Sequence, residues 1–97
     1  MRDERARIEH AIAAAQRLRD GHMPSDADLA AAPVLTAWIA SVEGPVVRLI
    51  GVVVGHPTIA DGWCTTSAVL WIADDGTCCR TVGRLYRLGS RLGEGEQ

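Results

Sequence analysis

Several residue types are missing from this sequence, and long apolar runs are missing too. The 97 residues include no lysine, asparagine or phenylalanine, so all ten basic side chains are arginines. No run approaches the roughly 20 apolar residues of a membrane span, because Arg48 and Gly51 interrupt the longest one. The charged start at Arg2 and Asp3 is unlike a signal peptide. We therefore expect a cytoplasmic protein that does not bind membranes.

Cysteine is too scarce for a disulfide framework. The three thiols are Cys64, Cys78 and Cys79, an odd count with one adjacent pair. Neighbouring residues of a strand point to opposite faces, so Cys78 and Cys79 do not suit one metal ion. No Cys-x-x-Cys spacing is present. We expect reduced cysteines, no metal site and no cofactor.

A strong basic excess is also lacking. The formal net charge is −2, whereas general nucleic-acid binders usually carry a clear positive excess. Residues 77–97 hold four of the arginines, so any basic patch must be local. The length allows one domain, 1–97.

The first part of the chain, about residues 2–38, reads as helical. One helix is predicted over residues 2–20, because apolar residues recur there at 3.6-residue spacing. They are Ile8, Ala11, Ile12, Ala15 and Leu18. Ser25 resembles an N-cap that starts a second, short helix. Pro33 then ends this helix or begins another turn over residues 34–38.

The second part, about residues 45–89, reads as a sheet. Residues 46–54, 63–73 and 78–88 are rich in β-branched and aromatic side chains and predict three strands. Gly44-Pro45 and Asp75-Gly76 are turn signals, and residues 55–62 form a loop. The expected fold is α+β: an N-terminal helix plus a short helix packed on a three-stranded antiparallel meander. Residues 90–97 are expected to form a flexible tail.

A type I′ turn at Asp75-Gly76 would fix the register of the last two strands. Trp71 would lie opposite Arg80, and side-chain alternation would then define two faces. Leu70, Ile72, Ala68 and Leu85 would face the helix. The other face would carry the residues that we predict to bind a partner: Trp63, Trp71, Arg80, Arg84 and Tyr86. A register slip of one residue would exchange the two faces.

His56 is the residue that most resembles a catalytic one. It lies in a loop, with Asp61 and Ser67 following. A Ser–His–Asp arrangement requires convergence in space, and Ser67 falls within a predicted strand. The simpler interpretation is that the His56 ring hydrogen-bonds the backbone and shapes the loop. We predict no catalytic residue and no enzyme.

Four motifs in the second half carry a resemblance. They are Gly-His-Pro-x-Ile-x-Asp-Gly at 55–62, Thr-Thr-Ser at 65–67, Arg-Thr at 80–81 and Arg-Leu-Tyr-Arg-Leu-Gly at 84–89. Together with residues 25–35 and Trp38, they resemble a family of short, uncharacterised proteins from bacterial chromosomes and mobile elements. The resemblance implies a bacterial host cell and no established activity. In size and compactness the chain is also similar to anti-CRISPR proteins, which bind Cascade-type complexes.

These observations lead to one function hypothesis and two alternatives. The leading hypothesis is a non-enzymatic protein-binding module, in its narrower form a phage-derived inhibitor that keeps a CRISPR effector from its target DNA. An acidic surface would assist it, made of Asp26, Asp28, Glu43, Asp61, Asp74 and Asp75. The first alternative is a small nucleic-acid-binding regulator that uses Arg80, Arg84 and Tyr86. The second is a homodimeric structural protein.

Overall fold

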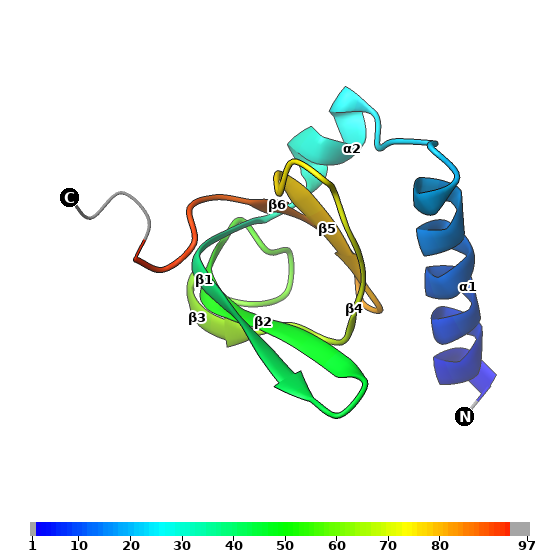
Figure 1. Ribbon diagram of the computed structural model, residues 1–97, viewed down its shortest axis with the longest axis horizontal. Helices are drawn as coiled ribbons and strands as arrows, with labels where there is room; N and C mark the ends of the chain where they lie inside the picture. The colour runs from blue at the N-terminus through cyan, green and yellow to red at the C-terminus, as the bar shows by residue number, and fades with distance from the viewer. Residues whose placement is uncertain (1, 94–97) are drawn as a thin grey trace.

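The computed structural model describes residues 2–93 and contains two helices followed by six strands (Figure 1). The helices are α1 (Arg2–Arg19) and α2 (Asp26–Ala31). The strands are β1 (Val34–Glu43), β2 (Val46–Val54), β3 (Gly62–Thr65), β4 (Val69–Ile72), β5 (Cys78–Thr81) and β6 (Leu85–Leu88). They form one mixed sheet in the order β3-β2-β1-β6-β5-β4. The predicted three-stranded antiparallel meander is therefore wrong, although helices and a sheet are both present.

Both helices follow from local sequence signals. The N–H of Gly21 donates to the carbonyl of Leu18 and that of His22 to Arg17, which is the Schellman arrangement that ends α1. Gly21 fits there because its φ of +97° is one that glycine adopts without strain. At α2, Ser25 and Asp28 form a reciprocal capping box. The helix predictions fail only beyond Pro33, where the chain enters β1.

Strand β1 replaces the helical turn considered for residues 34–38 and continues to Glu43. It pairs with β2 across the turn at Gly44-Pro45, where Glu43 lies opposite Val46. A bulge between Thr36 and Ile39 interrupts their register. The apolar, partly β-branched run of β1 suits a strand next to β2, and pairing with β2 overrides the helical interpretation.

Two predicted strands are each divided in two. Residues 63–73 form β3 and β4, and residues 78–88 form β5 and β6. The second division is a tight turn in which the Thr81 hydroxyl accepts hydrogen bonds from the N–H groups of Gly83 and Arg84, both at 3.2 Å. This side chain stabilises a reversal for which the sequence has no Asn-Gly or Asp-Gly signal.

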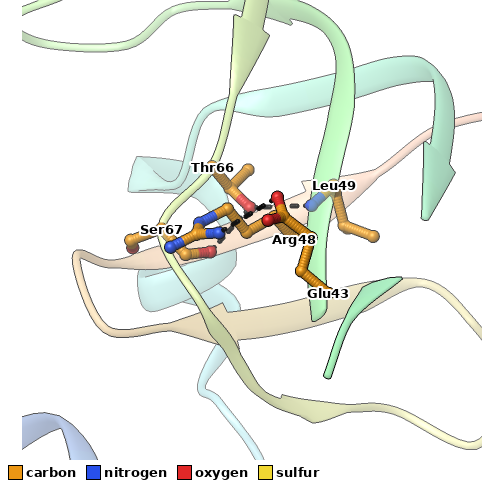
Figure 2. Close-up of polar contacts among 5 residues, drawn as sticks. All are labelled: Glu43, Arg48, Leu49, Thr66 and Ser67. Carbon is orange, nitrogen blue, oxygen red and sulfur yellow. Dashed lines mark hydrogen bonds and ion pairs between the residues drawn. The ribbon is translucent and has the colours of Figure 1, made fainter. Parts of the chain in front are cut away.

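The sheet is strongly curled, because β3 and β4 follow each other in the chain but lie at its two opposite edges. Strands β3 and β4 are the two edge strands, yet few residues separate them, and β4 contacts β2. Thr66 holds this corner (Figure 2): its N–H donates to the Leu49 carbonyl at 2.8 Å, and its hydroxyl accepts from the Leu49 N–H at 3.0 Å. The same hydroxyl donates to the carbonyl of Ser67 at 2.8 Å. The Val82 N–H bonds to the Ala68 carbonyl, so the corner joins both halves of the sheet.

The core lies inside the curl. Its buried residues are Leu35, Trp38, Leu49, Val53, Cys79 and Tyr86. Gly51 is required here, because a Cβ at this position would lie 2.8 Å from the Thr36 carbonyl oxygen and 3.0 Å from the Trp38 Cβ. Arg91 and Leu92 also contact Trp38, through a guanidinium over the ring and a backbone hydrogen bond. Of the tail expected over 90–97, residues 94–97 lie outside the described part of the chain.

Helix α1 lies outside the curl, against β4 and β5 (Figure 1). Of its predicted apolar stripe, Ala11 and Ala15 are buried, Leu18 is half-buried, and Ile8 and Ile12 are exposed. The helix therefore covers the sheet mainly through alanines, and its two isoleucines remain at the surface.

Candidate functional site

The structure separates the five residues that the sequence placed on one partner-binding face. Trp71 and Arg80 are paired across β4 and β5, as predicted. The predicted register fails beyond this pair, since a bulge lies between Val69 and Trp71 and β3 pairs with β2. The turn itself holds only one residue with positive φ, Gly76, so it is not the expected type I′ turn.

Tyr86 is a clear correction, because it is only 5% exposed and belongs to the core. The unpredicted turn before β6 places Tyr86 opposite Cys79 instead of on the outer face. Burial raises the pKa of the Tyr86 phenol. The nucleic-acid alternative thereby loses its stacking residue, since a buried ring offers no face to a base.

Two residues that were predicted to face the helix, Leu85 and Ile72, also lie elsewhere. Leu85 pairs with Arg80 across β5 and β6 and so lies on the same face as Arg80, although it was predicted on the other face. Ile72, expected to pack against the helix, is 38% exposed. In contrast, Cys79 is fully buried inside the curl, and its burial raises the thiol pKa to about 12.

Trp63 is the most exposed aromatic residue among those described, at 67%. It lies on edge strand β3, opposite Val52 of β2. Every second residue of β2, counted from Val52, points to the same side of the sheet as Trp63. The β1 residues paired with these positions point to that side as well. Several of these side chains are apolar. We call this set the bare sheet face: Ile39, Ile50, Val52, Val54 and Trp63. Within the described residues neither helix contacts β1, β2 or β3, so no layer covers this face.

Arg80 and Arg84 belong to a different surface. They line a hollow of about 770 Å³ that is bounded by α1, by α2 and by the turn region between β5 and β6. We call it the arginine hollow. Its arginine and histidine lining residues are Arg17, Arg80, Arg84, His10 and His22. Its apolar lining includes Ala13, Ala14, Leu18, Met23, Pro33 and Leu85. Trp71 lies beside a second, smaller hollow next to the C-terminal end of α1.

The sequence interpretation missed the helical side of this hollow. His10, Ala13, Ala14, Arg17 and Leu18 recur at 3.6-residue spacing, beside the stripe that was taken as the buried one. That periodicity was the available signal. It did not reveal which strands α1 would face, because that depends on packing between distant segments.

The predicted acidic residues are all exposed but lie on separate elements. Asp26 and Asp28 are in α2, Glu43 ends β1, Asp61 is in the loop before β3, and Asp74 and Asp75 form the β4–β5 turn. Three of them bond to nearby backbone N–H groups: Asp28 to Ser25, Asp61 to Gly55 and Asp75 to Thr77. Glu43 lies 4.0 Å from Arg48 (Figure 2). The local bonds of Asp28, Asp61 and Asp75 give these three residues structural roles in a helix cap, a loop and a turn.

The catalytic-looking residues are engaged in separate structural bonds. The His56 Nδ1 accepts the N–H groups of Thr58 and Ile59 at 3.1 and 3.2 Å, which shapes the loop. The Ser67 hydroxyl accepts from the Gly83 N–H at 2.9 Å. Asp61 accepts from the Gly55 N–H at 3.0 Å. The structure therefore does not bring these three side chains together as a catalytic unit.

In residues 2–93, no group of three or more His, Cys, Asp or Glu side chains is placed to hold a metal ion. Cys64, Cys78 and Cys79 are free thiols, and burial raises the pKa of each. Over the same residues, no helix is long and apolar enough to cross a membrane.

The fold and the two surfaces define a small α+β protein with a curled mixed sheet. The chain belongs to a family described as a family of unknown function (DUF6634), which matches residues 2–96. Membership agrees with the expected uncharacterised family. No curated protein and no solved structure matches the chain.

Proposed function

We propose that this protein is a non-enzymatic binding module that docks a partner protein on the bare sheet face. The observation that carries the proposal is Trp63, an indole 67% exposed on an edge strand and paired with apolar Val52. Ile39 and Val54 on the same face are 43% and 46% exposed. Contiguous exposed apolar patches are typical of interaction sites, and tryptophan is enriched among residues that dominate binding energy.

The edge of β3 suggests how a partner is held. Strand β3 pairs with β2 on one side only, and the other side carries the backbone groups of a sheet edge. An extended partner segment can add to such an edge through main-chain hydrogen bonds, while its side chains contact the adjacent apolar face. The partner that fits is therefore a protein with an exposed, apolar strand.

The proposal is tested by quantitative affinity capture with wild-type protein and two variants. Trp63→Ser removes the exposed indole, while Ile12→Ser removes an apolar side chain of similar exposure on α1. We expect one partner protein to be retained by the wild type and by Ile12→Ser and to be lost with Trp63→Ser. A purified partner would then bind at least tenfold more weakly to the Trp63 variant, as for a central aromatic anchor.

Two outcomes contradict the proposal. One is a partner that is retained equally by Trp63→Ser and wild type. The other is self-association measured by light scattering that Trp63→Ser abolishes, which would support the homodimer in place of a different partner.

The narrower form of the proposal concerns a CRISPR effector. It rests on the analogy in size and compactness drawn from the sequence. It is tested by adding the protein to a purified Cascade-type complex and measuring target DNA binding. Unchanged DNA binding at protein excess excludes that complex as the partner and leaves the docking surface to be tested by capture.

A further inference from the structure

The arginine hollow presents positive charge that no acidic group of the described residues neutralises. The side chains of Arg17, Arg80 and Arg84 make no ion pair or hydrogen bond within residues 2–93. The one carboxylate in the lining is Asp28, and it is held by the capping box of α2. The hollow therefore combines three guanidinium groups with no committed counter-charge.

Arg80 carries the strongest part of this observation. Its Nε is buried and has no hydrogen-bond partner among the described residues. Buried polar atoms are nearly always hydrogen-bonded, so an exception calls for an explanation such as a missing ligand. Burial and the neighbouring positive charge of Arg84 both lower the Arg80 pKa. An anion held by the guanidinium groups in the hollow would relieve the repulsion between the two arginines.

The remaining walls indicate what the rest of the ligand is like. Ala13 and Ala14 from α1, Pro33, and Leu85 from β6 give the hollow apolar sides next to its charged end. A volume of about 770 Å³ falls within the range usual for small-molecule sites. Mainly apolar walls with a few placed polar groups are also typical of such sites.

We infer that the arginine hollow binds a small organic anion, with its anionic head at Arg80 and Arg84 and its apolar body against α1 and Leu85. Guanidinium groups suit this role because their planar donors match carboxylate and phosphate oxygens. The net charge of −2 and the burial of Tyr86 disfavour a long polyanion such as nucleic acid. This inference does not depend on the bare sheet face, which lies on other strands.

The test compares probes that differ in one part at a time. Octanoate and octyl phosphate share an apolar chain and carry an anionic head, octanol has the chain without the charge, and inorganic phosphate has the charge without the chain. Binding is followed by amide chemical shifts, with expected changes at Ala13, Ala14 and Leu85. We expect at least one of the two amphipathic anions to bind at least tenfold more tightly than octanol and inorganic phosphate.

Arginine variants locate the site. Arg80→Gln and Arg84→Gln should each weaken binding of that anion by about tenfold, because each removes a charge-assisted hydrogen bond. Arg48→Gln is the matched control, since Arg48 is a half-buried strand arginine outside the hollow. Circular dichroism confirms that the variants remain folded.

The inference is overturned if neither amphipathic anion binds, or if octanol binds as tightly as they do. It is also overturned if both arginine variants bind as the wild type does. Equal binding of inorganic phosphate would contradict the apolar body and leave only a small inorganic-ion site. Trp63→Ser should bind the probes normally, which keeps failure of this inference distinct from failure of the docking proposal.

Discussion

The two halves of the sheet have outer surfaces of opposite character. Strands β1–β3 present the apolar bare sheet face, which no helix of the described chain contacts. Strands β4–β6 present Trp71, Arg80 and Arg84, and this half lies under the two helices. The helices thus cover the half that carries Arg80 and leave open the half that carries Trp63. This difference is the basis of the two proposals, a protein partner on the bare sheet face and a small anion in the arginine hollow.

The largest expected effect contrasts two aromatic residues that the sequence assigned to one face. Tyr86→Ala should lower the free energy of unfolding by about 3–5 kcal/mol, because it empties part of the core. Trp63→Ala should change it by less than about 0.5 kcal/mol, since the indole is mostly exposed. Urea denaturation of both variants measures the contrast. Equal effects would show that the bare sheet face is covered in solution.

The second prediction concerns the inner side of the apolar half. Gly51→Ala should destabilise the protein by about 3 kcal/mol, because the new Cβ would clash with the Thr36 carbonyl and the Trp38 Cβ. Gly83→Ala is the matched control, since its Cβ would meet two side-chain hydroxyls and no backbone atom, Ser67 at 3.3 Å and Thr81 at 3.8 Å. Thermal unfolding of the two variants ranks them. A Gly83 variant less stable than the Gly51 variant would contradict this account of the core.

The third prediction tests the corner that joins the halves. Thr66→Val should cost about 2 kcal/mol, because the buried Leu49 N–H loses the hydroxyl that accepts its hydrogen bond (Figure 2). Thr65→Val provides the control, as Thr65 is exposed on β3. Hydrogen exchange at the Leu49 amide should also accelerate in the Thr66 variant alone. An unchanged exchange rate would show that another group satisfies this amide.

The smallest expected effect is a pH dependence in the loop that leads to β3. The Nδ1 of His56 accepts backbone N–H groups, and burial and the charge of Arg84 lower its pKa below the ordinary 6.5. The unfolded chain therefore binds a proton more readily than the folded one, and this contribution to stability is lost as pH falls below about 6.5.

Chemical denaturation at pH 7.5 and pH 5.5 measures this dependence. The wild type should lose more stability between these values than His56→Gln, which has no group to titrate at that position. His10 and His22 are present in both proteins and cancel in the comparison. The same pH dependence in both would remove His56 as its source.

Local signals predicted the elements that depend on nearby residues. The capping box of α2 and the bounds of β2 follow from Ser25, Asp28 and the β-branched run between two turns. Strand β1 was missed because its pairing with β2 and β6 overrides the local helical signal, and periodicity does not reveal strand pairing. The β5–β6 turn was missed because the Thr81 side chain takes the place of the usual turn residues.

The missed packing between distant segments and the missed β5–β6 turn also explain which residues of the candidate sites were misplaced. Trp71 and Arg80 were paired correctly because their register depends only on a local hairpin. Tyr86 was misplaced by the hidden turn, which changes the face on which the following residues lie. Arg17 was overlooked because helix packing, and not a motif, brings it to Arg80 and Arg84.

The parallel pairing of β1 with β6 has a consequence for the order of folding. Strands β1–β3 and β4–β6 are each antiparallel meanders that need only short loop closures. Their union joins residues far apart in the chain, as in the hydrogen bond from Trp38 Nε1 to the Gly89 carbonyl across 51 positions. Such contacts require the costliest loop closure. We expect the meanders to form early and to dock last, with low φ-values at Trp38 and Leu88 and higher ones within each meander.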